Sequence, residues 1–161
     1  MDPQKLSALL WNERELLEFL AFKLDEHHLL LTTGRSRWIK FATTEIDQAT
    51  QRLRAAGLAR DLAVSTLAES WGLADAPSLR QIIAGAPAGP WAEIFSSHLE
   101  ALTALTDEIQ KLRDANEVLL REAVQSTEAA IAARKSAEPS SNHPGPAAEP
   151  GESPRTAGRT V

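Results

Sequence analysis

The chain has 161 residues, of which 22 are acidic and 17 are basic, and it has a formal net charge of −5 and no cysteine. The lack of cysteine excludes disulfides, a thiol nucleophile and zinc–thiolate sites. The excess of acidic residues makes a nucleic-acid partner a poor fit, because binding to the phosphate backbone depends on clustered Lys and Arg. No apolar run approaches the roughly 20 residues of a membrane-spanning helix and the N-terminus lacks a signal-peptide pattern, so the sequence predicts a soluble cytoplasmic protein without membrane insertion.

The first predicted helix runs from about residue 4 to residue 31. Its apolar residues recur at spacings of three, four and seven, which places them along one side of a helix. Glu13 falls on this stripe where a Leu is expected, and Gly34 suits the left-handed position that ends a helix. The stripe consists of Leu6, Leu9, Leu10, Leu16, Leu17, Leu20, Leu24 and Leu31.

Three further segments precede the last helix. A second helix is predicted from Ser36, a residue type that caps helices, and Gly57 is expected to break or kink it. A third helix is predicted over residues 58–71, where Leu58, Leu62, Leu67 and Trp71 are its apolar residues. A short helix capped by Ser78 should follow up to residue 84.

The longest predicted helix begins near Trp91 and meets no Gly or Pro before Pro139. About 45 residues at 1.5 Å per residue span about 65–70 Å, against about 40 Å for the first helix. A heptad seam alternates in steps of three and four, which is typical of knobs-into-holes packing. It runs through Leu102, Leu105, Ile109, Leu112, Asn116, Leu119, Ala123, Ser126 and Ala130. Asn116 either fixes register inside this seam or lies exposed at its edge.

These patterns predict an all-α fold, an elongated antiparallel helical bundle or coiled coil with a long C-terminal helix. Residues 1–135 should form the helical domain. Residues 136–161 should form a disordered tail, because five prolines and a single large apolar residue, Val161, cannot offset the entropy of ordering the chain.

A second apolar stripe appears beside the weakened seam after Asn116. It consists of Leu120, Val124, Thr127 and Ile131, so the apolar face rotates around the helix at this point. Such a face could meet a partner helix or form a groove for a partner's apolar segment. Internal packing against the second or third predicted helix stays open as an alternative.

No catalytic or metal site is predicted. His27 and His28 are adjacent, so they point about 100° apart on a helix, and no His-x-x-x-His or Glu-x-x-His spacing occurs. No glycine-rich phosphate-binding motif is present either. The sequence therefore indicates an interaction protein that is not an enzyme and that uses no cofactor.

Three segments together resemble the FlgN-type flagellar export chaperones. The first helix opens over residues 9–20 with LLWNERELLEFL and ends over residues 29–34 with LLLTTG. The middle stretch contains SWGL at 70–73 and SLRQII at 78–83, and the last helix contains LRDANEVLL at 112–120. The resemblance covers about residues 5–132 and lies in the order and spacing of these segments.

The resemblance implies a chaperone that holds hook–filament junction proteins before type III secretion and presents them to the export machinery. Its last helix would grip an amphipathic helix at the end of these hook-associated proteins and mask it, without chemistry. The implied binding residues are Asn116, Leu119, Leu120, Ala123, Val124, Thr127 and Ile131. The alternative function is a structural coiled-coil adaptor or scaffold that self-associates, and the sequence leaves a homodimer open.

Overall fold

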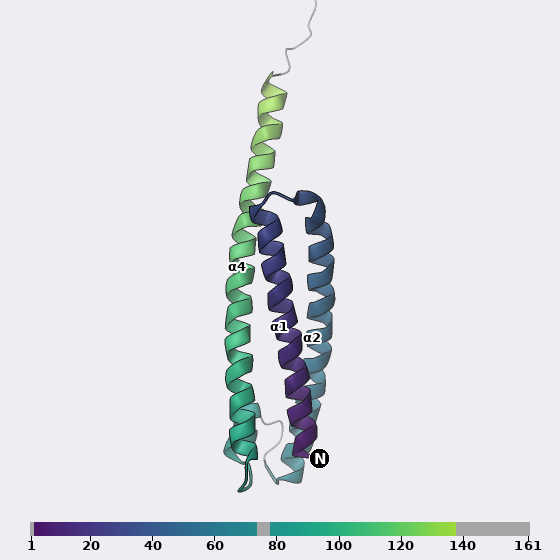
Figure 1. Cartoon of the computed structure of the whole chain (residues 1–161), viewed down its shortest axis with the longest axis vertical. Coiled ribbons are helices and arrows are strands. Elements are labelled where there is room, and N and C mark those ends of the chain that lie inside the picture. The colour runs from purple at the N-terminus through teal and green to yellow at the C-terminus, as the bar shows by residue number, and fades with distance from the viewer. Residues whose placement is uncertain (1, 74–77, 138–161) are drawn as a thin grey trace, which may run out of the picture. The chain divides into compact units, whose positions relative to one another are not determined.

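The computed structural model describes residues 2–73 and 78–137, and its elements are four helices (Figure 1). They are α1 (Pro3–Thr32), α2 (Ser36–Ser70), α3 (Leu79–Ala84) and α4 (Trp91–Ala137), and no strand occurs in the described ranges. The predicted all-α fold with a long C-terminal helix is confirmed. The tail predicted over 136–161 lies outside the described residues from 138 onward.

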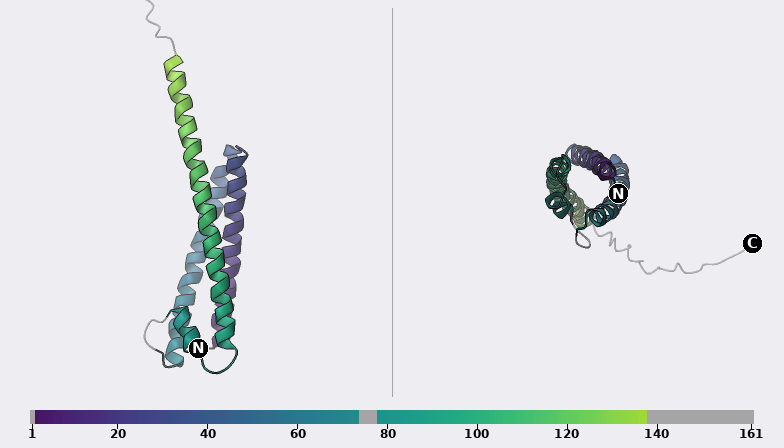
Figure 2. Two further views of the ribbon diagram at one scale, coloured as in Figure 1. Left: turned by 90° about the vertical axis from the view of Figure 1, so that its left-hand side faces the viewer. Right: turned by 90° about the horizontal axis from the view of Figure 1, so that it is seen from below.

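The chain divides into two units, residues 1–126 and residues 127–161. The first unit contains α1, α2, α3 and most of α4, and its long helices run up, down and up (Figures 1 and 2). In the second unit the described residues, 127–137, are the C-terminal part of α4.

Helices α1 and α2 form the most closely packed pair of the first unit. The α2 face toward α1 carries a buried alanine at every seventh position: Ala42, Ala49, Ala56 and Ala63. Small side chains let the two backbones approach within 8 Å between Cα atoms, and within the described residues α4 comes that close to neither helix. Helix α4 therefore reaches the α1–α2 pair through larger side chains.

The core of the first unit lies between the three long helices. Leu6, Leu10 and Leu20 of α1 are at most 1% exposed, and Phe95 of α4 is completely buried beside them in one apolar cluster. Ile82 of the short α3 joins this cluster. Each such side chain contributes about 1.5–3 kcal/mol by leaving water, so packing rather than local propensity holds the helices together.

The turn at Gly34 and the cap at Ser78 follow the sequence prediction. Gly34 and Gly72 both adopt φ of 68°, the left-handed conformation that ends α1 and α2 at low cost. Ser78 caps α3 by accepting a hydrogen bond from the Gln81 backbone N–H, and the Gln81 side chain accepts one from the Ser78 N–H in return. None of the described helices is long and apolar enough to cross a membrane.

The predicted break at Gly57 is wrong, because α2 is one uninterrupted helix from Ser36 to Ser70. A glycine inside a helix costs only about 0.5–1 kcal/mol, and the α1-facing stripe continues through it from Ala56 to Ala63. Packing of this stripe outweighs the local penalty. Ser36 is also not the N-cap; that position is Arg35, which makes no side-chain capping bond.

We expect Gly57→Ala to stabilise the protein by about 0.5–1 kcal/mol, because alanine loses less backbone entropy in a helix. The added Cβ would meet only the Arg60 Nη2 atom, at 3.8 Å, which is ordinary contact. Urea denaturation followed by circular dichroism measures the change. A lower midpoint for the variant would contradict the description of α2 as an unstrained continuous helix at this residue.

Candidate partner-binding surface on helix α4

The first half of α4 is an internal packing surface. Phe95, Leu102 and Ile109 are at most 8% exposed, and Leu105 and Leu112 pack against the same core. Their steps of three and four follow the predicted seam. The first half of the predicted seam is therefore an internal packing surface.

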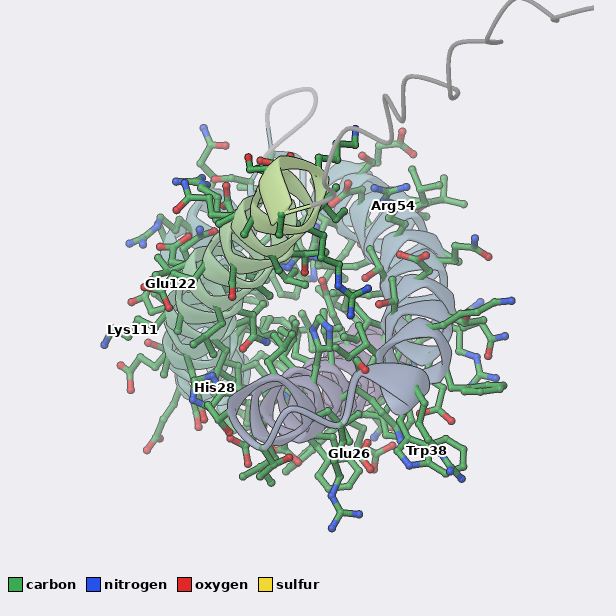
Figure 3. The ribbon with its side chains drawn as sticks, turned by 90° about the horizontal axis from the view of Figure 1, so that it is seen from above. Glu26, His28, Trp38, Arg54, Lys111 and Glu122 are labelled. Atoms are coloured by element: carbon green, nitrogen blue, oxygen red, sulfur yellow. The ribbon has the colours of Figure 1, made fainter. Side chains whose placement is uncertain are left out.

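Asn116 lies inside the bundle at the end of that seam. Its side chain is 3% exposed, and its Nδ2 donates a hydrogen bond to the Leu24 carbonyl at 2.9 Å. Its Oδ1 lies 2.9 Å from Nδ1 of His28, and because an amide oxygen only accepts, the imidazole Nδ1–H donates this bond. Figure 3 shows His28 on the side of α1 next to α4. Of the two alternatives left open for Asn116, the buried one holds.

Polar contacts at two levels of the bundle thus hold α1 and α4 in one register. At the start of both helices Ser7 Oγ lies 3.2 Å from His98 Nε2, and toward the end of α1 His28 and Leu24 hold Asn116. The contact near the start of α1 is made by a residue near the start of α4, and the contact near the end of α1 is made by a later residue of α4. The two helices are therefore parallel. Burial lowers the pKa of the His98 imidazole, and Arg14 lowers it further, so the neutral ring is favoured.

We expect Asn116→Ala to destabilise the protein by about 1–2 kcal/mol, because it removes two hydrogen bonds and leaves the His28 N–H without its acceptor. Chemical denaturation measures this loss. His28→Ala should cost less, since Asn116 keeps its bond to the Leu24 carbonyl. An equal loss in both variants would contradict a separate contribution from the bond between Asn116 and the Leu24 carbonyl.

The apolar stripe of α4 becomes exposed directly after Asn116. Leu119 is half-buried, whereas Leu120 is 37% and Val124 56% exposed, and Ala123 is exposed as well. Thr32, the last residue of α1, is four residues beyond His28, and Leu120 is four residues beyond Asn116. Because the helices are parallel, Leu120 is level with the end of α1. The α4 residues from there to Ser126 have no further turn of α1 beside them.

The described part of the second unit carries the rest of the predicted stripe. All residues from 127 to 137 are exposed, and Ile131 is 50% exposed. Within the first unit, the alternative of internal packing against the second or third predicted helix does not describe Leu120 or Val124, because each keeps at least a third of its surface in water. We call Leu119, Leu120, Ala123 and Val124 the α4 stripe.

The polar partners of Asn116 were not predicted from the sequence. The adjacent His27 and His28 were considered only as metal ligands, whereas the structure buries His27 at 6% exposure and turns His28 toward Asn116. A signal for these partners that the sequence does contain is the spacing of Leu24 and His28. The two residues are one helical turn apart and so lie on the same face of the first helix.

One ion pair is built into the interior of the first unit. Glu13, at 6% exposure, accepts a hydrogen bond from the guanidinium of Arg60, and the two residues occupy facing positions of α1 and α2. Burial raises the pKa of the Glu13 carboxyl, and the Arg60 charge offsets only part of that rise. Glu13 thus replaces the Leu expected at its position with a paired charge.

The chain was compared with protein families, curated proteins and solved structures. The family model described as FlgN protein matches residues 1–146, which include all described residues of both units. No curated protein and no solved structure matches the chain.

Proposed function

We propose that this chain, which belongs to the FlgN family of flagellar export chaperones, binds the hook-associated proteins of the hook–filament junction. It would do so in the cytoplasm and mask their amphipathic terminal helix before type III secretion. Membership of the family supports the role in flagellar export, and the resemblance of the segments described above supports the choice of clients.

The observation that carries the proposal is the exposed apolar surface of Leu120 and Val124 in the α4 stripe. Leu120 and Val124 expose apolar surface on a helix whose earlier turns pack their apolar residues into the core of the first unit. An amphipathic helix of a client can bury this surface by laying its own apolar face against it. Each aliphatic side chain buried in this way contributes about 1.5–3 kcal/mol before the cost of association.

The proposed contacts are those of the α4 stripe, with Thr127 and Ile131 continuing the same periodicity in the second unit. Asn116 has a different part in the proposal. Since it is buried and bonded to α1, it would position the stripe instead of touching the client. The contact set needs no catalytic group, because the proposed action is physical masking of an apolar helix.

Isothermal titration of the full chain with a purified junction protein tests the proposal. We expect saturable binding that disappears when the terminal helix of the junction protein is deleted. Binding that survives this deletion, or no binding to any junction protein, would contradict the proposed clients.

Self-association is the second candidate function, and the same exposed stripe favours it, because a second copy could cover Leu120 and Val124 as well as a client could. Sedimentation velocity separates the two. A tight dimer that persists when junction protein is added would support the scaffold, whereas a monomer that shifts only on adding client supports the chaperone.

A further inference from the structure

A basic segment stands out in this acidic chain. Residues 27–44 contain Arg35, Arg37 and Lys40 but no Asp or Glu, although the whole chain carries a net charge of −5. The segment spans the end of α1, the Gly34 turn and the first turns of α2. All three cations are exposed at this end of the α1–α2 hairpin.

Two aromatic side chains are exposed among these cations. Trp38 is 41% and Phe41 60% exposed, and their ring centroids lie 5.9 Å apart. The Arg37 guanidinium lies 4.2 Å from the Trp38 ring centroid, so cation and aromatic form one surface. Figure 3 shows Trp38 pointing away from the space between the helices. We call Arg35, Arg37, Trp38, Lys40 and Phe41 the tip patch.

The start of α2 adds to the positive potential of the tip patch. The N-cap residue Arg35 makes no side-chain capping bond, and no acidic residue occupies the first turn. The backbone N–H groups there keep the partial positive charge of a helix N-terminus. Lys23 contributes little, because Glu26 and Glu45 both pair with it.

We propose that the tip patch binds the surface of an anionic membrane peripherally. Clustered Lys and Arg attract anionic headgroups, and Trp and Phe place their rings at the headgroup level of a bilayer. The charge of the remaining chain does not prevent this, because at physiological salt charges act over only about 8 Å. An acidic protein is the less favoured partner, since two exposed aromatic rings in the first turns of α2, beside the cations, suit the apolar–polar boundary of a bilayer.

The expected affinity is modest and reversible. Each Lys or Arg close to an anionic surface improves partitioning by about fivefold, and the tip patch offers three. The proposal is independent of the client-binding function, because its residues are the N-cap and first turns of α2 and the α4 stripe is not involved.

Co-sedimentation of the full chain with sucrose-loaded vesicles tests the proposal. We expect clear binding to vesicles of three parts phosphatidylcholine and one part phosphatidylglycerol, and at least about tenfold weaker binding to pure phosphatidylcholine. Arg35→Gln with Arg37→Gln and Lys40→Gln should lower binding about tenfold or more, and so should Trp38→Ala with Phe41→Ala. Raising salt from 50 to 500 mM should also release the protein.

Two matched controls make the test specific. Arg54→Gln with Lys111→Gln and Arg134→Gln removes three exposed cations elsewhere and should leave binding unchanged. Leu58→Ala with Leu62→Ala removes two side chains that are 72% and 70% exposed and should also leave it unchanged. Equal losses in the controls, or equal binding to both kinds of vesicle, would overturn the proposal. Binding to soluble polyglutamate but not to vesicles would overturn it as well, in favour of an acidic protein partner.

Discussion

Leu120→Asp combined with Val124→Asp is expected to abolish measurable binding of junction proteins, with a loss in affinity of about 100-fold or more. Both side chains belong to the exposed α4 stripe, and burying a carboxylate without a partner in an apolar interface costs more than the lost contact alone. Neither side chain is needed for the core, so helicity and the midpoint of thermal unfolding should stay close to the wild-type values. Titration calorimetry and circular dichroism measure the two quantities.

Val118→Asp is the matched control for this pair. Val118 is 51% exposed, about as much as Val124, but it lies two residues before Leu120 and so points to nearly the opposite side of the helix. It should leave binding unchanged. If the double variant binds a junction protein as the wild type does, the α4 stripe is not the binding surface.

The fold was predictable from the sequence wherever local signals and packing agree. The end of α1 at Gly34 and the capping box of α3 both follow from residue types with one favoured conformation. Gly57 was misread because its local preference opposes helix, whereas the alanines on either side of it pack against α1. That packing belongs to a distant part of the chain and cannot be read from the helix itself.

The apolar residues predicted over 58–71 were only partly right, for a related reason. Leu67 is completely buried, but Leu58 and Leu62 are 72% and 70% exposed, while Ala63 faces α1. A scale of hydrophobicity favours the leucines. Close approach of two helices favours the smaller side chain. Whether hydrophobicity or small size decides which residue is buried depends on the helix that packs against it.

The place where α4 becomes exposed was predicted in outline. The heptad steps placed Asn116 on the seam, and the change of stripe after it was visible as Leu120 and Val124. The sequence could not show that α1 ends level with Leu120, because that depends on the register between two helices that are about 90 residues apart in the chain. This register determines which apolar residues of α4 pack against α1 and which lie beyond its end.

Arg60→Leu is expected to destabilise the protein by about 3 kcal/mol at pH 8. The substitution leaves the Glu13 carboxylate buried without its counter-ion, and breaking one side of a buried pair typically costs about 3–5 kcal/mol. The value is placed at the lower end because the Arg60 side chain is 28% exposed, so water screens part of the interaction. Arg121→Leu breaks an ion pair with Glu117 in which both side chains are about two-thirds exposed, and it should change stability by less than about 0.5 kcal/mol.

The pH dependence of Arg60→Leu identifies the cause. Burial already raises the pKa of Glu13 in the folded protein, and without Arg60 nothing offsets that rise. Folding then favours the protonated carboxyl, so the stability of the variant is greatest below the unfolded pKa of about 4.3 and is lost as pH rises through the raised folded pKa. The difference from wild type should therefore be smaller at pH 4.5 than at pH 8, as measured by urea denaturation at both values.

Glu13→Leu combined with Arg60→Leu should restore stability to the wild-type level or above it. The double variant places a leucine at the position where the α1 stripe predicts one, and a well-packed apolar pair often equals or exceeds a buried ion pair. It should also lack the added pH dependence, because no buried carboxyl remains there. If Arg60→Leu costs as much at pH 4.5 as at pH 8, the loss comes from the packing of the Arg60 stem and not from the charge left on Glu13.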